Sequence, residues 1–229
     1  RGRYEIIPSL ILEGGVRQSA LGRRELAPTY DRPNGYHNVR TDGGEYGVDG
    51  APIVTDLTLS YFGRPATNLY SRTTVGYLER MYGGLSTEVL WKPVDSRMAF
   101  GAELNYARQR DFDMGFGFQD YDTVTGYLSA YYSLGNGFHT QVDAGRYLAG
   151  DWGATFALDR EFDNGWKVGA YFTLTDMPFE EFGEGSFDKG LQITMPTDFF
   201  LGTASRRTVS TKLASLTRNG GARLDVEGR

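Results

Sequence analysis

The chain has 229 residues, among them 31 Gly, 15 Tyr, 14 Phe and 3 Trp, and its formal net charge is −5. That charge excludes the concentrated basic face of a nucleic-acid-binding surface. The absence of cysteine excludes disulfides, thiolate metal sites and cysteine nucleophiles, and two histidines, His37 and His139, are too few for a His-rich metal centre. We therefore expect no nucleic-acid partner, no cofactor and no metal.

The chain contains no apolar run of about eighteen residues, the length that a membrane-spanning helix needs. Its first residues also lack the build of a signal peptide. The sequence starts at Arg1 without a methionine and stops within a predicted strand. We expect a processed or partial chain whose export signal lies upstream.

The first fifty residues show little periodicity. Residues 3–13 predict one strand with a proline inside it. Residues 14–50 are rich in Gly, Arg, Asp and Asn, which predicts a long loop or an irregular plug-like segment, with a short strand at 39–46. We therefore distinguish an irregular segment, residues 1–50, from a sheet domain, residues 51–229.

From residue 53 onward, apolar and polar side chains alternate with the period of two that only a β-strand produces. With the first strand, about eleven or twelve strands are predicted, and bacterial single-chain barrels have even numbers. The predicted strands are residues 53–61, 68–77, 85–91, 98–107, 123–134, 138–145, 152–159, 166–175 and 188–197, with two more at 210–216 and 222–227.

The predicted connections alternate between short and long. Tight turns at 63–65, 94–96, 135–137 and 163–165 contrast with long loops at 108–119 and 176–186. This asymmetry is typical of an outer-membrane barrel, so we predict an all-β fold, an antiparallel transmembrane β-barrel of about 12 strands with short periplasmic turns and longer external loops. The alternative is a soluble antiparallel sandwich or barrel, whose loops need not alternate in length.

In the barrel interpretation the polar face lines the lumen, where amides, carboxylates and tyrosines offer a ligand paired hydrogen-bond donors and acceptors as well as flat apolar rings. The alternative is that these groups only solvate the lumen and pair across strands. The candidates are Asp56, Asn68, Tyr70, Arg72, Glu88, Glu103, Asn105, His139, Gln141, Asp143, Asp159, Lys167, Tyr171 and Gln192.

If the alternation of their strands is extended by one residue, Arg146 and Arg160 both fall on the outward-facing side. They are expected near the membrane interfaces, where a guanidinium can bind lipid phosphate. A bulge at Gly145 is the alternative for Arg146, because it would turn that side chain inward.

Catalysis finds little support in the sequence. Many acidic residues are present, but nothing singles out the spaced carboxylate pair of a glycosidase. A serine hydrolase could use His139 with Ser129 or Ser133, yet no nucleophile motif marks either serine. We expect no catalytic residue.

Six stretches together carry a resemblance to a known family: VRTD at 39–42, GYLERMYGG at 76–84, EVLWKP at 88–93, AFGAELNYARQRDFD at 99–113, GRYLAGDWGAT at 145–155 and FGEGSFDKG at 182–190. With them the chain resembles the YjbH family of exopolysaccharide-biosynthesis outer-membrane proteins, to which the group 4 capsule barrel protein is related. The resemblance implies an outer-membrane β-barrel encoded alongside other exopolysaccharide secretion components, with no established enzymatic reaction. It also implies that this sequence is shorter than the usual family member.

The last of these stretches is the most distinctive, and three interpretations remain open for it. It is a gate or substrate contact, a calcium site built from Glu180, Glu181, Glu184 and Asp188, or a structural loop with glycines at positive φ. Its residues are Phe182, Gly183, Glu184, Gly185, Ser186, Phe187, Asp188, Lys189 and Gly190.

The barrel pattern and the resemblance together predict an outer-membrane component of exopolysaccharide or capsule biosynthesis and secretion, acting as a conduit or envelope scaffold without chemistry, and the resemblance makes polysaccharide the ligand expected at the polar face. The expected partners are outer-membrane lipid, exopolysaccharide and other secretion-system proteins. One alternative is an accessory barrel that conducts nothing and stabilises a larger membrane assembly. A second is an outer-membrane hydrolase.

Overall fold

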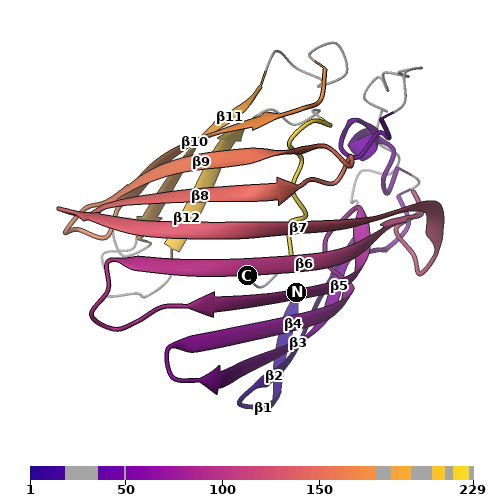
Figure 1. Ribbon diagram of the computed structural model, residues 1–229. Coiled ribbons are helices and arrows are strands. Elements are labelled where there is room, and N and C mark those ends of the chain that lie inside the picture. The colour runs from indigo at the N-terminus through magenta and orange to yellow at the C-terminus, as the bar shows by residue number, and fades with distance from the viewer. Residues whose placement is uncertain (19–35, 49, 179–186, 197–207, 215–218, 227–229) are drawn as a thin grey trace.

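The computed structural model describes residues 1–18, 36–48, 50–178, 187–196, 208–214 and 219–226. These residues form one antiparallel sheet of 12 strands, in which each strand pairs with its neighbours in sequence from β1 to β12. Figure 1 shows the sheet curling strongly, with the segment 219–226, drawn in yellow, crossing the strands. The predicted all-β antiparallel fold of about 12 strands is confirmed.

The strand boundaries follow the alternating pattern closely from β4 to β11. In this described part of the chain, no helix is long and apolar enough to cross a membrane. The strands are β1 Gly2–Ile7, β2 Leu10–Arg17, β3 Ile53–Ala66, β4 Leu69–Tyr77, β5 Tyr82–Trp91, β6 Met98–Arg110, β7 Phe118–Gly135, β8 Phe138–Arg146, β9 Trp152–Glu161, β10 Lys167–Thr175, β11 Asp188–Pro196 and β12 Thr208–Ala214.

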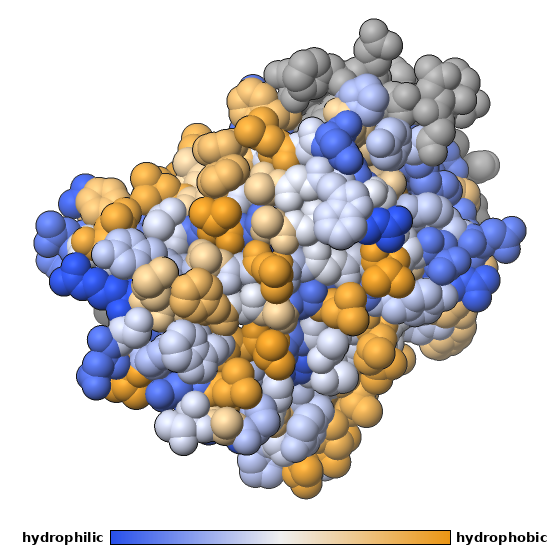
Figure 2. All heavy atoms as spheres, viewed as in Figure 1, coloured by the Kyte–Doolittle hydropathy of each residue, from blue (hydrophilic) through white to orange (hydrophobic). Residues whose placement is uncertain are grey.

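The two faces of the sheet have inverted polarity. On β6, Phe100 and Leu104 are 44% and 56% exposed, whereas Glu103 and Asn105 on the opposite face are 7% and 1% exposed. Figure 2 shows apolar residues spread over the outer face of the strands, with hydrophilic residues gathered toward the strand ends. Because a soluble sheet buries its apolar face, this arrangement is the reverse of a soluble core.

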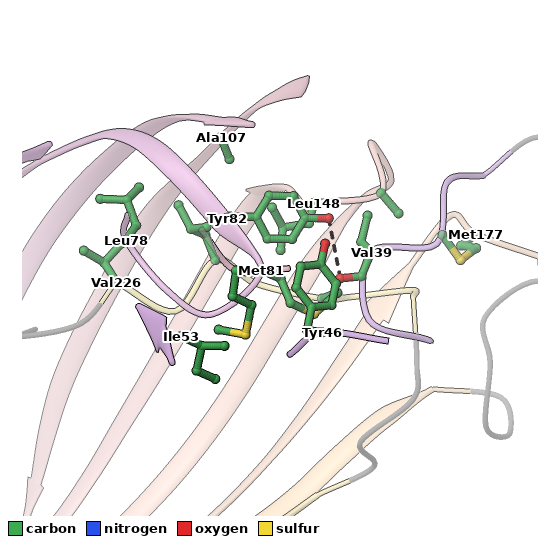
Figure 3. Close-up of a cluster of buried hydrophobic side chains, with 14 residues drawn as sticks. Val39, Tyr46, Ile53, Leu78, Met81, Tyr82, Ala107, Leu148, Met177 and Val226 are labelled. Carbon is green, nitrogen blue, oxygen red and sulfur yellow. Dashed lines mark hydrogen bonds between the residues drawn. The ribbon is translucent and has the colours of Figure 1, made fainter. Parts of the chain in front are cut away.

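A small apolar cluster lies inside the curl, at the end where β4 leads into β5 and β8 leads into β9 (Figure 3). Two segments that are not strands supply much of it: residues 36–48, through Val39 and Tyr46, and residues 219–226, through Leu224 and Val226. We call these two segments together the interior plug. They are joined where the side-chain oxygen of Asn219 accepts hydrogen bonds from the backbone N–H groups of Val39, at 3.0 Å, and Arg40, at 3.1 Å.

The plug corrects two strand predictions. Residues 39–46 contain a 3₁₀ helix, Thr41–Gly44, and not a strand. Residues 222–226 lie inside the curl and do not extend the sheet, because the glycines of the Asn-Gly-Gly run at 219–221 favour a turn. Of the early segment, residues 36–48 pack into the apolar cluster through Val39 and Tyr46.

Several turns also differ from prediction. Residues 3–13 form a hairpin, β1 and β2, which belongs to the same sheet as the later strands. Residues 63–65 lie within β3, where the register shifts, and the turn comes at 67–68, with Asn68 at φ +61°. The loop predicted at 108–119 shrinks to 111–117, and the connection 92–97 is longer than 78–81. Loop length therefore alternates only in part.

A β-bulge explains why one apolar residue faces the interior and not the outer side of the sheet. Ile53 shares its predicted parity with Leu57, yet it is 4% exposed and belongs to the apolar cluster. The pairing of β2 with β3 shifts between Gly15 and Val16, which reverses the facing of the first residues of β3.

The Gly-Asn-Gly hairpin between β7 and β8 provides a test of the fold. Gly137 has φ +76°, and a Cβ there would collide with the carbonyl oxygen of Glu161. Gly135 has φ +91° but open space around its Cβ position. We expect Gly135→Ala to lower the free energy of unfolding by about 1 kcal/mol, from backbone strain alone, and Gly137→Ala to lower it clearly more. Equal losses in chemical denaturation would contradict this register.

Candidate functional site: the polar interior

Arg223 of the interior plug lies at the centre of the polar face. Its guanidinium forms ion pairs with Glu103 on β6, at 3.2 Å, and with Asp143 on β8. It also lies over the ring of Tyr127, on the intervening strand β7, 4.2 Å from the ring centroid. Three adjacent strands thus converge on one cation, which neutralises two carboxylates that are each 3% exposed at the side chain.

The two carboxylates have further partners. Asn105 donates from Nδ2 to Glu103 at 2.9 Å, and Gln141 donates from Nε2 to both oxygens of Asp143, at 2.9 and 2.7 Å. The hydroxyl of Ser129 also donates to Asp143. Buried charges are tolerated only when they are paired and hydrogen-bonded, and this network meets that condition.

A second ion pair fastens the plug at the apolar end. Arg40 binds Glu79, in the connection between β4 and β5, through two hydrogen bonds of 2.7 and 3.0 Å, and also donates to the carbonyl oxygen of Arg223 at 2.7 Å. Glu79 accepts a third bond, from the backbone N–H of Asp225. Burial raises the pKa of the Glu79 carboxyl, and its pairing with Arg40 opposes that rise.

The opposite end of the interior is hollow. Two adjoining cavities of about 520 and 330 Å³ share His139 and Asp159. We call this space the vestibule; the inward-facing residues that line it include Tyr131, Ser133, His139, Gln141, Asp159, Lys167 and Gln192. It opens where the short turns at 136–137 and 162–166 lie.

Strand register gives the vestibule its arrangement. His139 on β8 lies between Ser133 on β7 and Asp159 on β9 as a direct cross-strand neighbour of both. Gly169, the partner of Asp159 on β10, has no side chain, and a Cβ there would collide with the Asp159 carboxylate. Within the described residues no hydrogen bond joins Ser133, His139 and Asp159, and Ser129, the other serine considered beside His139, donates its hydroxyl to Asp143.

The structure divides the predicted lumen residues into groups. Glu103, Asn105 and Asp143 meet around Arg223, whereas His139 and Lys167 line the vestibule. Gln141 belongs to both groups, because it lines the vestibule and donates to Asp143. Arg72 and Glu88 pair with each other across β4 and β5, at 3.2 Å.

Other predicted residues lie apart from both groups. The ring of Tyr171 packs against the backbone of Gly190, so a Cβ at that glycine would come within 2.5 Å of the ring. Arg146 faces outward, because the strand pairing continues through Gly145 without a bulge. Arg160 lies over the rings of Phe138 and Phe162, at 4.8 and 4.6 Å from their centroids.

The distinctive loop is described only from Phe187 onward. Lys189 lies over the Phe187 ring at 4.6 Å, and Asp188, 2% exposed, begins β11 opposite Thr173. The predicted residues 182–186, with Glu180 and Glu181 of the calcium hypothesis, lie outside the described residues. Among those that are described, no group of His, Asp and Glu is placed to hold a metal ion.

A family model described as "Exopolysaccharide biosynthesis protein YbjH" matches residues 1–229. The chain belongs to the YjbH family. It is 39% identical over 214 residues to the "Uncharacterized lipoprotein YjbH" of Escherichia coli (strain K12), a match that covers 87% of this chain and 30% of the E. coli protein. No solved structure matches. The family resemblance seen in the sequence is confirmed, and the family is one of exopolysaccharide biosynthesis.

Removal of Arg223 tests the buried network. Arg223→Ala leaves Glu103 and Asp143 buried without their cation, so we expect the free energy of unfolding to fall by about 3 kcal/mol. Lys167→Ala is the matched control, because its ion pair with Glu161 is half exposed and contributes at most about 1 kcal/mol. Denaturant titration of both variants measures the difference, and a similar small loss for the two would show that the network is not buried in solution.

Proposed function

We propose that this chain forms an outer-membrane β-barrel unit of an exopolysaccharide-biosynthesis protein. In this proposal the vestibule binds the polysaccharide, the interior plug closes the lumen, and the unit carries out no chemistry. It acts as a polymer-binding envelope scaffold and not as an open conduit.

The inverted polarity of the sheet supports a position in the membrane. Side chains such as Leu104, Leu128 and Trp152 are more than half exposed, and their burial in lipid would remove that apolar surface from water. A closed barrel would also satisfy the backbone groups of the edge strands, as a bilayer requires. The E. coli relative is named as a lipoprotein, which agrees with an envelope location.

The interior plug is the observation that favours a closed scaffold over a conduit. Residues 219–226 cross the polar face, and Arg223 is held there by ion pairs to two strands. The apolar cluster fills the end beyond them. A polymer that enters the vestibule would therefore meet the plug in this conformation.

The chemistry of the vestibule favours a sugar polymer. Imidazole, amide, carboxylate and ammonium groups of His139, Gln141, Asp159 and Lys167 supply both donors and acceptors for hydroxyl groups. Tyr131 adds a flat apolar ring of the kind that packs against sugar faces.

Conductance in planar bilayers tests the closed lumen. We expect the wild-type protein to pass little current, and Arg223→Glu to raise the current, because a third carboxylate repels Glu103 and Asp143 and releases the plug. Arg160→Glu changes an outward arginine and is the control. Heat-modifiable gel mobility verifies that each variant folds, and steady porin-like current through the wild type would contradict the closed lumen.

Polysaccharide binding tests the vestibule. We expect His139→Ala and Asp159→Ala each to weaken binding of exopolysaccharide fragments roughly three- to tenfold, the effect of one lost hydrogen bond. His37→Ala is the matched control, since His37 stacks on Tyr121 at the plugged end. Titration calorimetry gives the affinities. Equal affinity of wild type and vestibule variants would refute this site, and turnover of the polymer that is lost in His139→Ala would instead indicate a hydrolase.

A further inference from the structure

A hollow on the outer face of the sheet has no part in the proposed polysaccharide site. It extends from β5 to β9 and is centred on β6, β7 and β8, has a volume of about 570 Å³, and its accessible surface is almost entirely apolar. Its floor is formed by residues with small or no side chains, Ala102, Gly126 and Ala144. Taller side chains such as Leu104 and Leu128 flank this floor.

The register explains why the surface is hollow at this point. Gly126 is the direct partner of Leu104 on one side and of Arg146 on the other, while Leu128 pairs with Ala102 and Ala144. Large and small residues therefore alternate in both directions across the outer face. The missing side chain of Gly126 leaves the sheet backbone itself as the deepest part of the hollow.

A cation lies at one end of this apolar hollow. Arg146, the last residue of β8, donates from Nη1 to the carbonyl oxygen of Val124 at 2.7 Å, which holds the guanidinium against the sheet. In the described part of the chain this is the one hydrogen bond found for Arg146, and an arginine has five N–H donors. Trp152, its partner on β9, is 60% exposed at the same level, as aromatic side chains are at membrane interfaces.

We propose that this hollow binds one phosphate-bearing lipid of the bilayer, with an acyl chain in the apolar hollow and its phosphate on Arg146. The charge at one end and the apolar floor beyond it match the two parts of such a lipid. A guanidinium binds phosphate through paired, charge-assisted hydrogen bonds, and the backbone anchor at Val124 pre-orders it for that contact. The inference rests on the proposed membrane position and adds a defined lipid site to it.

Native mass spectrometry of the detergent-purified protein with added phosphatidylglycerol tests the site. We expect one retained lipid in the wild type. Arg146→Gln removes the cation and should weaken retention about tenfold, the effect of losing one charge-assisted contact, and Ala144→Leu should weaken it to a similar extent because the added side chain fills the hollow and excludes the acyl chain. Ala170→Leu and Arg160→Gln make the same changes elsewhere on the outer face and should retain the lipid as the wild type does.

Diacylglycerol with the same acyl chains is the head-group control. It should bind the wild type more weakly, and Arg146→Gln should not weaken it further. Equal retention of phosphatidylglycerol by all variants, or equal retention of the two lipids by the wild type, would overturn the site while leaving the membrane position intact. A protein that stays folded and soluble without detergent would instead refute the membrane position itself.

Discussion

The pairing of Arg223 with Glu103 and Asp143 is the interaction on which the interior depends. A sheet that turns its polar face inward gathers carboxylates in a space with little water, and these need a cation close by. The strands that hold the two carboxylates contribute no such cation to this cluster. It comes from a segment outside the sheet, so the residues that cross the polar face also neutralise its charge.

The same cation separates two regions of different character. On one side, Arg40 and Glu79 tie the plug to an apolar cluster that resembles a small soluble core. On the other side, His139 and Asp159 line an open space. The inner face is therefore not a uniform polar tube. A ligand that carries hydroxyl groups would find polar partners at the vestibule and apolar side chains at the opposite end.

The sequence predicted the sheet well because alternation is a local property. Residues 98–107 show their facing without reference to any other segment, and the structure agrees at Phe100, Glu103, Leu104 and Asn105. The plug could not be predicted in this way. Arg223 lies in a short stretch whose alternation imitates a strand, and only the Asn-Gly-Gly run before it signals a break. The bulge that inverts Ile53 is set by pairing with β2 and leaves no local pattern.

For the site residues, too, the sequence predicts the side of the strand but not the contacts. Sequence parity placed Glu103, Asn105, Gln141 and Asp143 on the inner face, but it could not tell which would be taken up by internal partners and which would face open space. That distinction depends on Arg223, which is 120 residues from Glu103 and 80 from Asp143.

The Asn219 contact implies an order of assembly. Every strand pairs with its neighbour in sequence, so the sheet can grow by local hairpins, which form early because they close short loops. The hydrogen bond between Val39 and Asn219 joins residues 180 positions apart in the sequence. It can form only when the segment beyond β12 reaches residues 36–48. We therefore expect the interior to pack after the sheet has formed, and until then Glu103 and Asp143 lack the cation of Arg223.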